Sequence, residues 1–188
     1  MDDLKPYLLT ILGIWGAQKA NPQSHSRLCS VVEKVSSQMG VNVPDVYVIQ
    51  NQKPSAMLCL FTGDLILTQG LLDMAQDNEL CGVLAHEMRH KQRAPHLWGA
   101  TLMVAVGLSV SVTMLTDARW AAALMSAPIV LSGIALMRHE EKEADKNAAQ
   151  LGYGEALNAF LSKRDEEQGG QSFFHRLIHS NNETRRNS

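Results

Sequence analysis

The chain has 188 residues and a formal net charge of -2, with 45% apolar and only 5% aromatic residues. This length fits one domain with room to bury a functional site, so we predict a single domain over residues 1–188. The near-neutral charge leaves no basic stripe for a phosphate backbone, which excludes a nucleic-acid-binding function. Cys29, Cys59 and Cys81 lack CxxC spacing and indicate neither a disulfide framework nor a cysteine-bound zinc.

The N-terminal half is predicted to combine helices with a small sheet. Residues 1–20 are apolar behind an acidic start, unlike a secretory signal, and predict a retained apolar helix. At this length a helix in the core is favoured over one that lies on a membrane surface. Apolar residues at helical spacing predict an amphipathic helix over residues 24–40. Three short apolar runs separated by Pro and Gly breaks, residues 46–49, 57–61 and 64–68, predict three strands of a small antiparallel or mixed sheet.

The central part of the chain is predicted to be helical and strongly apolar. Asp77 is typical of an N-cap, and the helix after it should run to about residue 93. Residues 97–115 and 120–137 carry no charged side chain and predict an apolar hairpin of two helices. Each run approaches the roughly 20 residues that span a hydrocarbon core, which favours a transmembrane hairpin over residues 97–137. Two apolar helices that bury each other in a soluble protein are the alternative.

Charges flanking the hairpin predict its orientation. Lys91, Arg93, Arg138 and Lys142 lie on the side of the two ends, whereas the connecting loop offers Arg119 against an acidic neighbour. If the hairpin spans a membrane, the positive-inside rule places its two ends, and the predicted helices that flank them, on the cytoplasmic side. Without that span we expect a cytoplasmic protein.

The C-terminal part is predicted to hold two more helices and a loose tail. A helix from about residue 138 to residue 151 should be closed by Gly152, and a shorter one should cover residues 155–163. Residues 165–188 are polar and contain Gly169-Gly170, so we predict a loosely ordered tail.

His86-Glu87-Met88-Arg89-His90 is an HExxH sequence on the helix expected over residues 77–93. Residues four apart share a helical face, so the two imidazoles can bind one tetrahedral metal while Glu87 faces the attacking water. The less specific alternative is an exposed helix face that happens to carry two histidines and a glutamate.

A second acidic segment, residues 138–145, can supply the third ligand that a catalytic zinc needs beside one open position. Glu141 and Asp145 are four apart, so one carboxylate can reach the metal while the other orients a ligand imidazole. By spacing alone Glu140 competes with Glu141 as ligand, and the face shared with Asp145 favours Glu141. We interpret Glu140 and Glu143 as part of a solvated acidic face.

Glu141-Lys142-Glu143-Ala144-Asp145 forms an ExxAD motif. Together the HExxH and ExxAD motifs resemble those of the metallopeptidase family of HtpX and the type I CAAX prenyl proteases. The resemblance covers about residues 24–165. Further short matches lie at residues 44–48, 55–57, 67–72, 78–80 and 83–85.

The resemblance implies an α+β fold, a mainly helical gluzincin-type domain with a small three-stranded sheet and an apolar helical hairpin. It also implies that Glu141 is the third ligand and that Asp145 supports it. Arg89 stands where the family usually has glycine, which adds charge near the cleft without removing a ligand. The substrate backbone would pair with an edge strand at Ser55, Ala56, Met57 and Leu58.

These features predict a zinc-dependent endopeptidase with one zinc per chain, held by His86, His90 and Glu141, and with Glu87 as general base. Its substrates would be membrane-associated or misfolded proteins or peptides. A second hypothesis is a non-proteolytic, zinc-stabilised chaperone-like or binding module at the membrane. The donor that stabilises the oxyanion stays open among His139, His175, His179 and Arg186.

Overall fold

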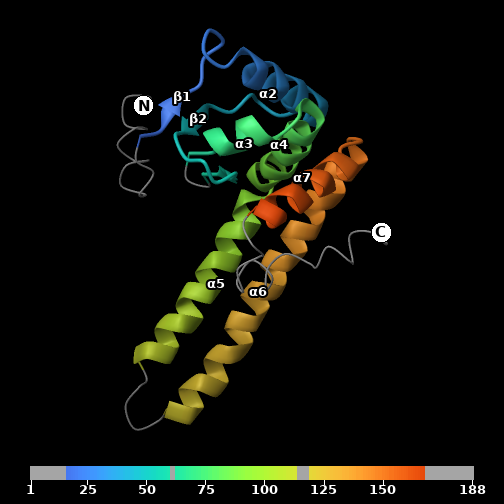
Figure 1. Cartoon of the computed structure of the whole chain (residues 1–188). Coiled ribbons are helices and arrows are strands. Elements are labelled where there is room, and N and C mark those ends of the chain that lie inside the picture. The colour runs from blue at the N-terminus through green and yellow to red at the C-terminus, as the bar shows by residue number, and fades with distance from the viewer. Residues whose placement is uncertain (1–15, 60–61, 114–118, 168–188) are drawn as a thin grey trace. The chain divides into compact units, whose positions relative to one another are not determined.

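The computed structural model describes residues 16–59, 62–113 and 119–167 (Figure 1). The chain divides into two compact units, whose described parts are residues 16–92 with 144–167 and residues 93–143. The first unit holds a sheet and four of the described helices, and the second holds a pair of helices. The apolar helix predicted over residues 1–20 is wrong for residues 16–20, where Gln18–Lys19 form a strand, and its residues 1–15 lie outside the described residues. The loose tail predicted over residues 165–188 is wrong for residues 165–167, which are helical, and its residues 168–188 lie outside the described residues.

Among the described residues the sheet has four strands in the order β1-β2-β4-β3, so β3 lies at an edge of it. Strands β2 (Val46–Ile49) and β4 (Leu65–Thr68) are parallel, and β3 (Ala56–Leu58) pairs antiparallel with β4. These three strands and the mixed sheet were predicted. The fourth, β1 (Gln18–Lys19), pairs antiparallel with β2 and was missed because two exposed polar residues carry no apolar alternation.

The helices of the first unit follow the predicted periodicity closely. Helix α2 (Ser26–Met39) ends at Gly40, whose φ of 63° is the left-handed conformation that glycine adopts without strain. Helices α3 (Gln69–Met74) and α4 (Asp77–Gln92) follow the sheet, and α7 (Gly154–Glu167) extends four residues beyond its prediction. Asp77 is the first residue of α4, so the predicted N-cap is wrong by one position.

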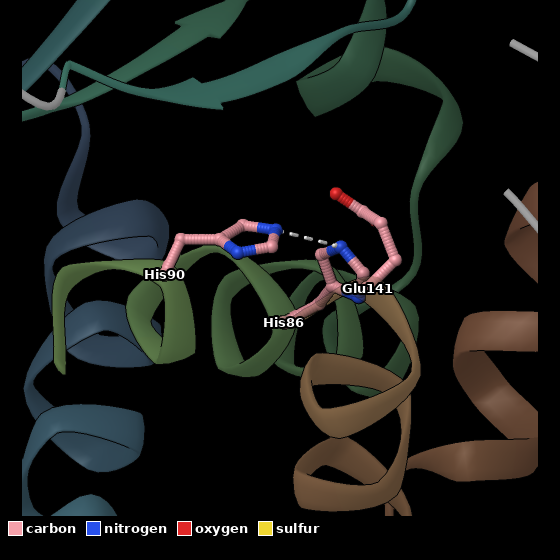
Figure 2. A group of neighbouring side chains, drawn as sticks. All are labelled: His86, His90 and Glu141. Atoms are coloured by element: carbon pink, nitrogen blue, oxygen red, sulfur yellow. Dashed lines mark hydrogen bonds between the residues drawn. The ribbon is translucent and has the colours of Figure 1, made fainter. Parts of the chain in front are cut away.

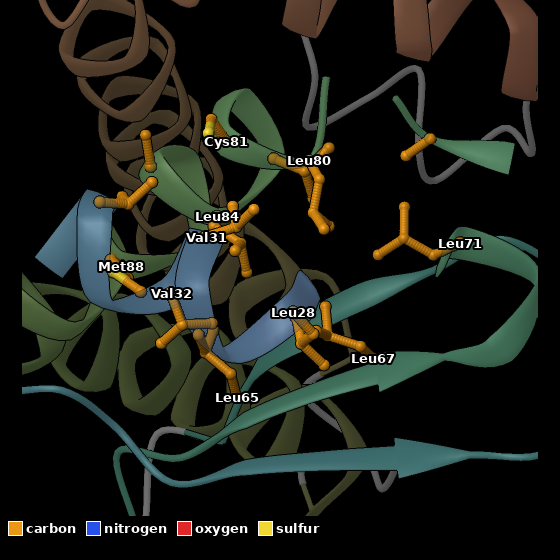
Figure 3. Close-up of a cluster of buried hydrophobic side chains, with 14 of the residues drawn as sticks. Leu28, Val31, Val32, Leu65, Leu67, Leu71, Leu80, Cys81, Leu84 and Met88 are labelled. Atoms are coloured by element: carbon orange, nitrogen blue, oxygen red, sulfur yellow. The ribbon is translucent and has the colours of Figure 1, made fainter. Parts of the chain in front are cut away.

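The hydrophobic core of the first unit is built around α4 (Figure 3). One face of the sheet meets α2 and α4, and each fully buried leucine there contributes roughly 1.5–3 kcal/mol. At Gly82 a Cβ would come within 3.1 Å of the Leu157 Cβ, so α4 and α7 pack closely at that point. The core therefore fixes α4 from several sides. Its largest fully buried side chains include Leu65, Leu67, Leu80, Leu84 and Met88.

The second unit contains the predicted helical hairpin. Helices α5 (Ala94–Thr113) and α6 (Arg119–Gln150) run side by side (Figure 1). They approach closely at Gly133, where a Cβ would lie 2.6 Å from the Val104 Cγ2. The two helices predicted over residues 120–137 and 138–151 are one helix of 32 residues, which includes Pro128 and continues into the first unit.

Within the described residues, no helix is both long and apolar enough to cross a membrane. The transmembrane interpretation of residues 97–137 is thus left without support from the structure.

Candidate metal centre

Helix α4 places His86 and His90 on the same face, one turn apart (Figure 2). Both residues are buried, and their rings meet edge to face with centroids 4.9 Å apart. The two Nε2 atoms lie 3.2 Å from each other. The HExxH spacing thus brings two imidazole nitrogens to one point.

These distances fit a tetrahedral metal. Two nitrogens at about 2.0–2.1 Å from a zinc, at the tetrahedral angle, lie roughly 3.3–3.4 Å apart. One carboxylate oxygen of Glu141 joins them, and the ligand atoms of His86, His90 and Glu141 all lie within 4.8 Å of one another (Figure 2). Two imidazoles and one carboxylate are the donor set of catalytic zinc sites that keep one position open.

Asp145 lies one turn beyond Glu141 on α6 and contacts one of the two histidines. Its Oδ1 is 3.0 Å from His86 Nδ1. With the Nδ1–H donating to the carboxylate, the lone pair of Nε2 is left for a metal. The structure thus brings Asp145 to the imidazole that the ExxAD spacing predicted it to orient.

Glu87 faces the edge of the sheet. The Leu58 N–H donates to Glu87 Oε2 at 3.1 Å. Ser55 accepts from the Thr68 N–H at 3.0 Å, so its carbonyl faces β4. Because alternate residues of an antiparallel strand face opposite sides, Ala56 and Leu58 direct their backbone groups to the open edge. The predicted base and the predicted edge strand are therefore neighbours.

Met57 belongs to β3 and Arg89 to α4. The Met57 backbone faces β4, opposite Ile66, and its side chain is exposed. The Arg89 Nη1 donates to the Gln92 Oε1 at 2.7 Å, so this cation contacts its own helix beside the second histidine.

The interpretation of Glu140 as part of a solvated face is wrong. Glu140 is only 1% exposed, and both its oxygens accept from Arg93 at 2.8 Å. These hydrogen bonds hold the pKa of Glu140 below its ordinary value despite burial, which acts in the opposite direction. The partner is 47 residues away, so no local pattern could have revealed it.

Of the open oxyanion candidates, His139 is exposed on α6. His175, His179 and Arg186 lie outside the described residues.

Comparison with known proteins adds an independent finding. The sequence profile of Peptidase family M48 matches residues 22–163. A protease HtpX homologue of Acidiphilium cryptum is 33% identical over 180 residues, which are 83% of this chain and 62% of that protein. One from Campylobacter curvus is 28% identical over 181 residues, 81% of this chain and 61% of that protein. Another, from Desulfatibacillum aliphaticivorans, is 33% identical over 116 residues, 60% of this chain and 36% of that protein.

The chain thus spans between about a third and three fifths of the length of these relatives. The profile match covers well over half of the chain and includes both the HExxH and the ExxAD segments. It confirms the resemblance that these two motifs indicated, and the chain belongs to peptidase family M48.

Proposed function

We propose that the chain is a zinc-dependent endopeptidase in which His86, His90 and Glu141 hold the metal and Glu87 is the general base. The observation that carries this proposal is the convergence of the three ligand atoms within 4.8 Å, with two imidazole nitrogens at near-tetrahedral spacing. Membership of a peptidase family supports a peptide bond as the substrate.

A zinc at these ligands would supply Lewis acidity to the attacking water and the scissile carbonyl. The Glu87 carboxylate takes the proton from the water and passes it to the leaving amine. The Asp145 Oδ1 lies 3.0 Å from His86 Nδ1 and keeps the proton of the imidazole on that nitrogen. The Nε2 atom of His86 would therefore remain available to a metal throughout the reaction. No covalent intermediate with the chain is needed.

Substrate would bind as an extended segment along β3. An edge strand recognises backbone N–H and C=O groups, and therefore accepts many sequences as long as they are unfolded. In the structure the Leu58 N–H donates to Glu87 Oε2 at 3.1 Å. A substrate carbonyl that accepts from this N–H in its place would release the Glu87 carboxylate to face the water. This mode supports misfolded proteins as the substrate class.

The variant Glu87→Gln tests the proposed base. It should keep zinc and fold, measured by metal content and circular dichroism, and lose roughly 10²–10⁴-fold in cleavage of an unfolded casein-type substrate. Glu155→Gln, an exposed change on α7, is the matched control and should cleave like wild type. Full activity of the zinc-loaded Glu87→Gln variant would remove the assigned base. Zinc bound by wild type without any turnover would favour the non-proteolytic module.

Association with a membrane through residues 97–137, with the active site on the cytoplasmic side, stays a prediction. Carbonate extraction of membranes tests it, because release of the chain into the supernatant would contradict a spanning hairpin. Large apolar side chains exposed on α5 support the association: Trp98, Leu102, Met103 and Val106.

A further inference from the structure

A bidentate ion pair lies beside the metal ligands in the sequence. Arg93 is the single residue between α4 and α5 and follows His90 by three positions. Glu140 directly precedes Glu141 on α6. The Arg93 Nε donates to Glu140 Oε2 and its Nη2 donates to Oε1, both at 2.8 Å.

Because this ion pair is buried, it is expected to add little to the stability of the fold. The Glu140 side chain is 0% exposed and that of Arg93 is 27% exposed. Removing both charges from water costs about as much as their attraction returns, so buried ion pairs often add little stability over apolar residues of the same size. Two parallel hydrogen bonds between a guanidinium and a carboxylate do, however, fix the distance and orientation of the groups that carry them. The main effect of the ion pair is therefore to fix the position and orientation of the two side chains.

The orientation of these side chains matters because two adjacent residues, Glu140 and Glu141, each carry a carboxylate that could bind the metal. Neighbouring side chains on a helix point about 100° apart, so only one of Glu140 and Glu141 can face a given point. Once Glu140 is held by Arg93, the direction of Glu141 is set as well. Both oxygens of Glu140 are also occupied, which removes it as a competing ligand.

We propose that Arg93 and Glu140 are positioning residues that select Glu141 over Glu140 as the third metal ligand. This inference rests on the proposed function, because only there is Glu141 a ligand. Arg93 acts through Glu140 and contacts no ligand itself in the described hydrogen bonds. Its effect should therefore appear in metal binding and turnover rather than in substrate affinity.

The test uses the full chain and two variants, Arg93→Lys and Glu140→Gln. Lysine keeps the charge but lacks the planar fork, and glutamine keeps the size but not the charge. Glu79→Gln is the matched control, because Glu79 is also buried and forms an ion pair, with Lys163 at 2.5 Å. This ion pair joins α4 to α7 and does not involve α6. Zinc affinity is measured by competition with a chelator, stability by chemical denaturation, and ligand geometry by the visible spectrum of the Co²⁺-loaded protein.

We expect both variants to bind zinc 10–100-fold more weakly, as when other outer partners of a metal ligand are lost. Their kcat should fall while KM stays within about twofold of wild type, and their Co²⁺ spectra should differ from that of wild type. The control should lose stability yet bind zinc within twofold of wild type.

The proposal is overturned if Arg93→Lys and Glu140→Gln both bind zinc like wild type while they lose as much stability as the control. Glu141→Gln separates this failure from that of the proposed function. Loss of zinc in Glu141→Gln with no effect in the two pair variants would refute only the positioning role. Unchanged zinc affinity in Glu141→Gln would refute the ligand assignment itself.

Discussion

Replacing Asp145 with alanine should weaken metal binding while the fold persists. Asp145 Oδ1 lies 3.0 Å from His86 Nδ1, and its side chain is 20% exposed. Alanine removes the acceptor, so the imidazole can rotate and change the position of its proton. Partial exposure keeps the cost to folding small, because water can replace the lost hydrogen bond.

The expected loss of zinc affinity follows from the role of Asp145 as the partner of a ligand histidine. Losing the group that orients a ligand histidine typically costs 10–100-fold in metal affinity, which is about 1.4–2.8 kcal/mol at about 1.4 kcal/mol per tenfold change. Asp145→Ala should lie near the upper end of this range. Asp145→Asn keeps one oxygen acceptor but loses the charge, so it should lie near the lower end.

Chelator competition at neutral pH gives the zinc affinities, and thermal unfolding of the metal-free proteins shows that each variant folds. Asp45→Ala is the control, because Asp45 pairs with Lys19 at 2.8 Å and is 28% exposed, and it directly precedes β2 rather than belonging to the helices that carry the predicted ligands. A zinc affinity of Asp145→Ala within twofold of wild type would refute the orienting role of this carboxylate.

Two further predictions concern the stability of the first unit. Leu84 lies on α4 and is fully buried in the core that α4 shares with α2 and the sheet, so Leu84→Ala should lower the free energy of unfolding by about 3 kcal/mol in chemical denaturation. A loss under about 1 kcal/mol would contradict the packing described. Burial raises the pKa of Glu79, but hydrogen bonds from Lys163 and the Gln76 N–H outweigh it and leave that pKa below the ordinary 4.5. The stabilisation from this pair is therefore present above pH 4.5 and lost as the pH falls through the lower folded-state pKa. Lys163→Met should destabilise the metal-free chain at pH 7, and its deficit against wild type should shrink below about pH 4.5; a deficit independent of pH would contradict this linkage.

Local sequence patterns predicted most of the first unit because its elements carry their own signals. Helix α2 combines apolar spacing with a terminal glycine, and β2 and β4 are short β-branched runs between breaks. The ligand geometry of His86 and His90 follows from helical periodicity alone. Contacts between residues far apart in the sequence could not be predicted from local patterns, and the two-residue strand β1 is defined by its backbone pairing with β2.

The errors on α6 have a related cause. Charges begin at Arg138, which suggested a new helix there, but α6 passes through this point without a break, and it accommodates both Pro128 and Gly133. Glu140 was interpreted as part of a solvated acidic face. Its actual partner is Arg93, whose positive charge was interpreted as one of those that flank a membrane-spanning hairpin.

The open edge at β3 also affects how copies of this chain behave in a crowded solution. An unpaired strand edge can template pairing with another molecule, and proteins limit this hazard with short edge strands and nearby charges. Strand β3 has three residues, and its Leu58 N–H is already engaged by the Glu87 carboxylate. A neighbouring copy would have to displace that negative group to extend the sheet. The same carboxylate that is proposed to activate water thus discourages aggregation through the edge it faces.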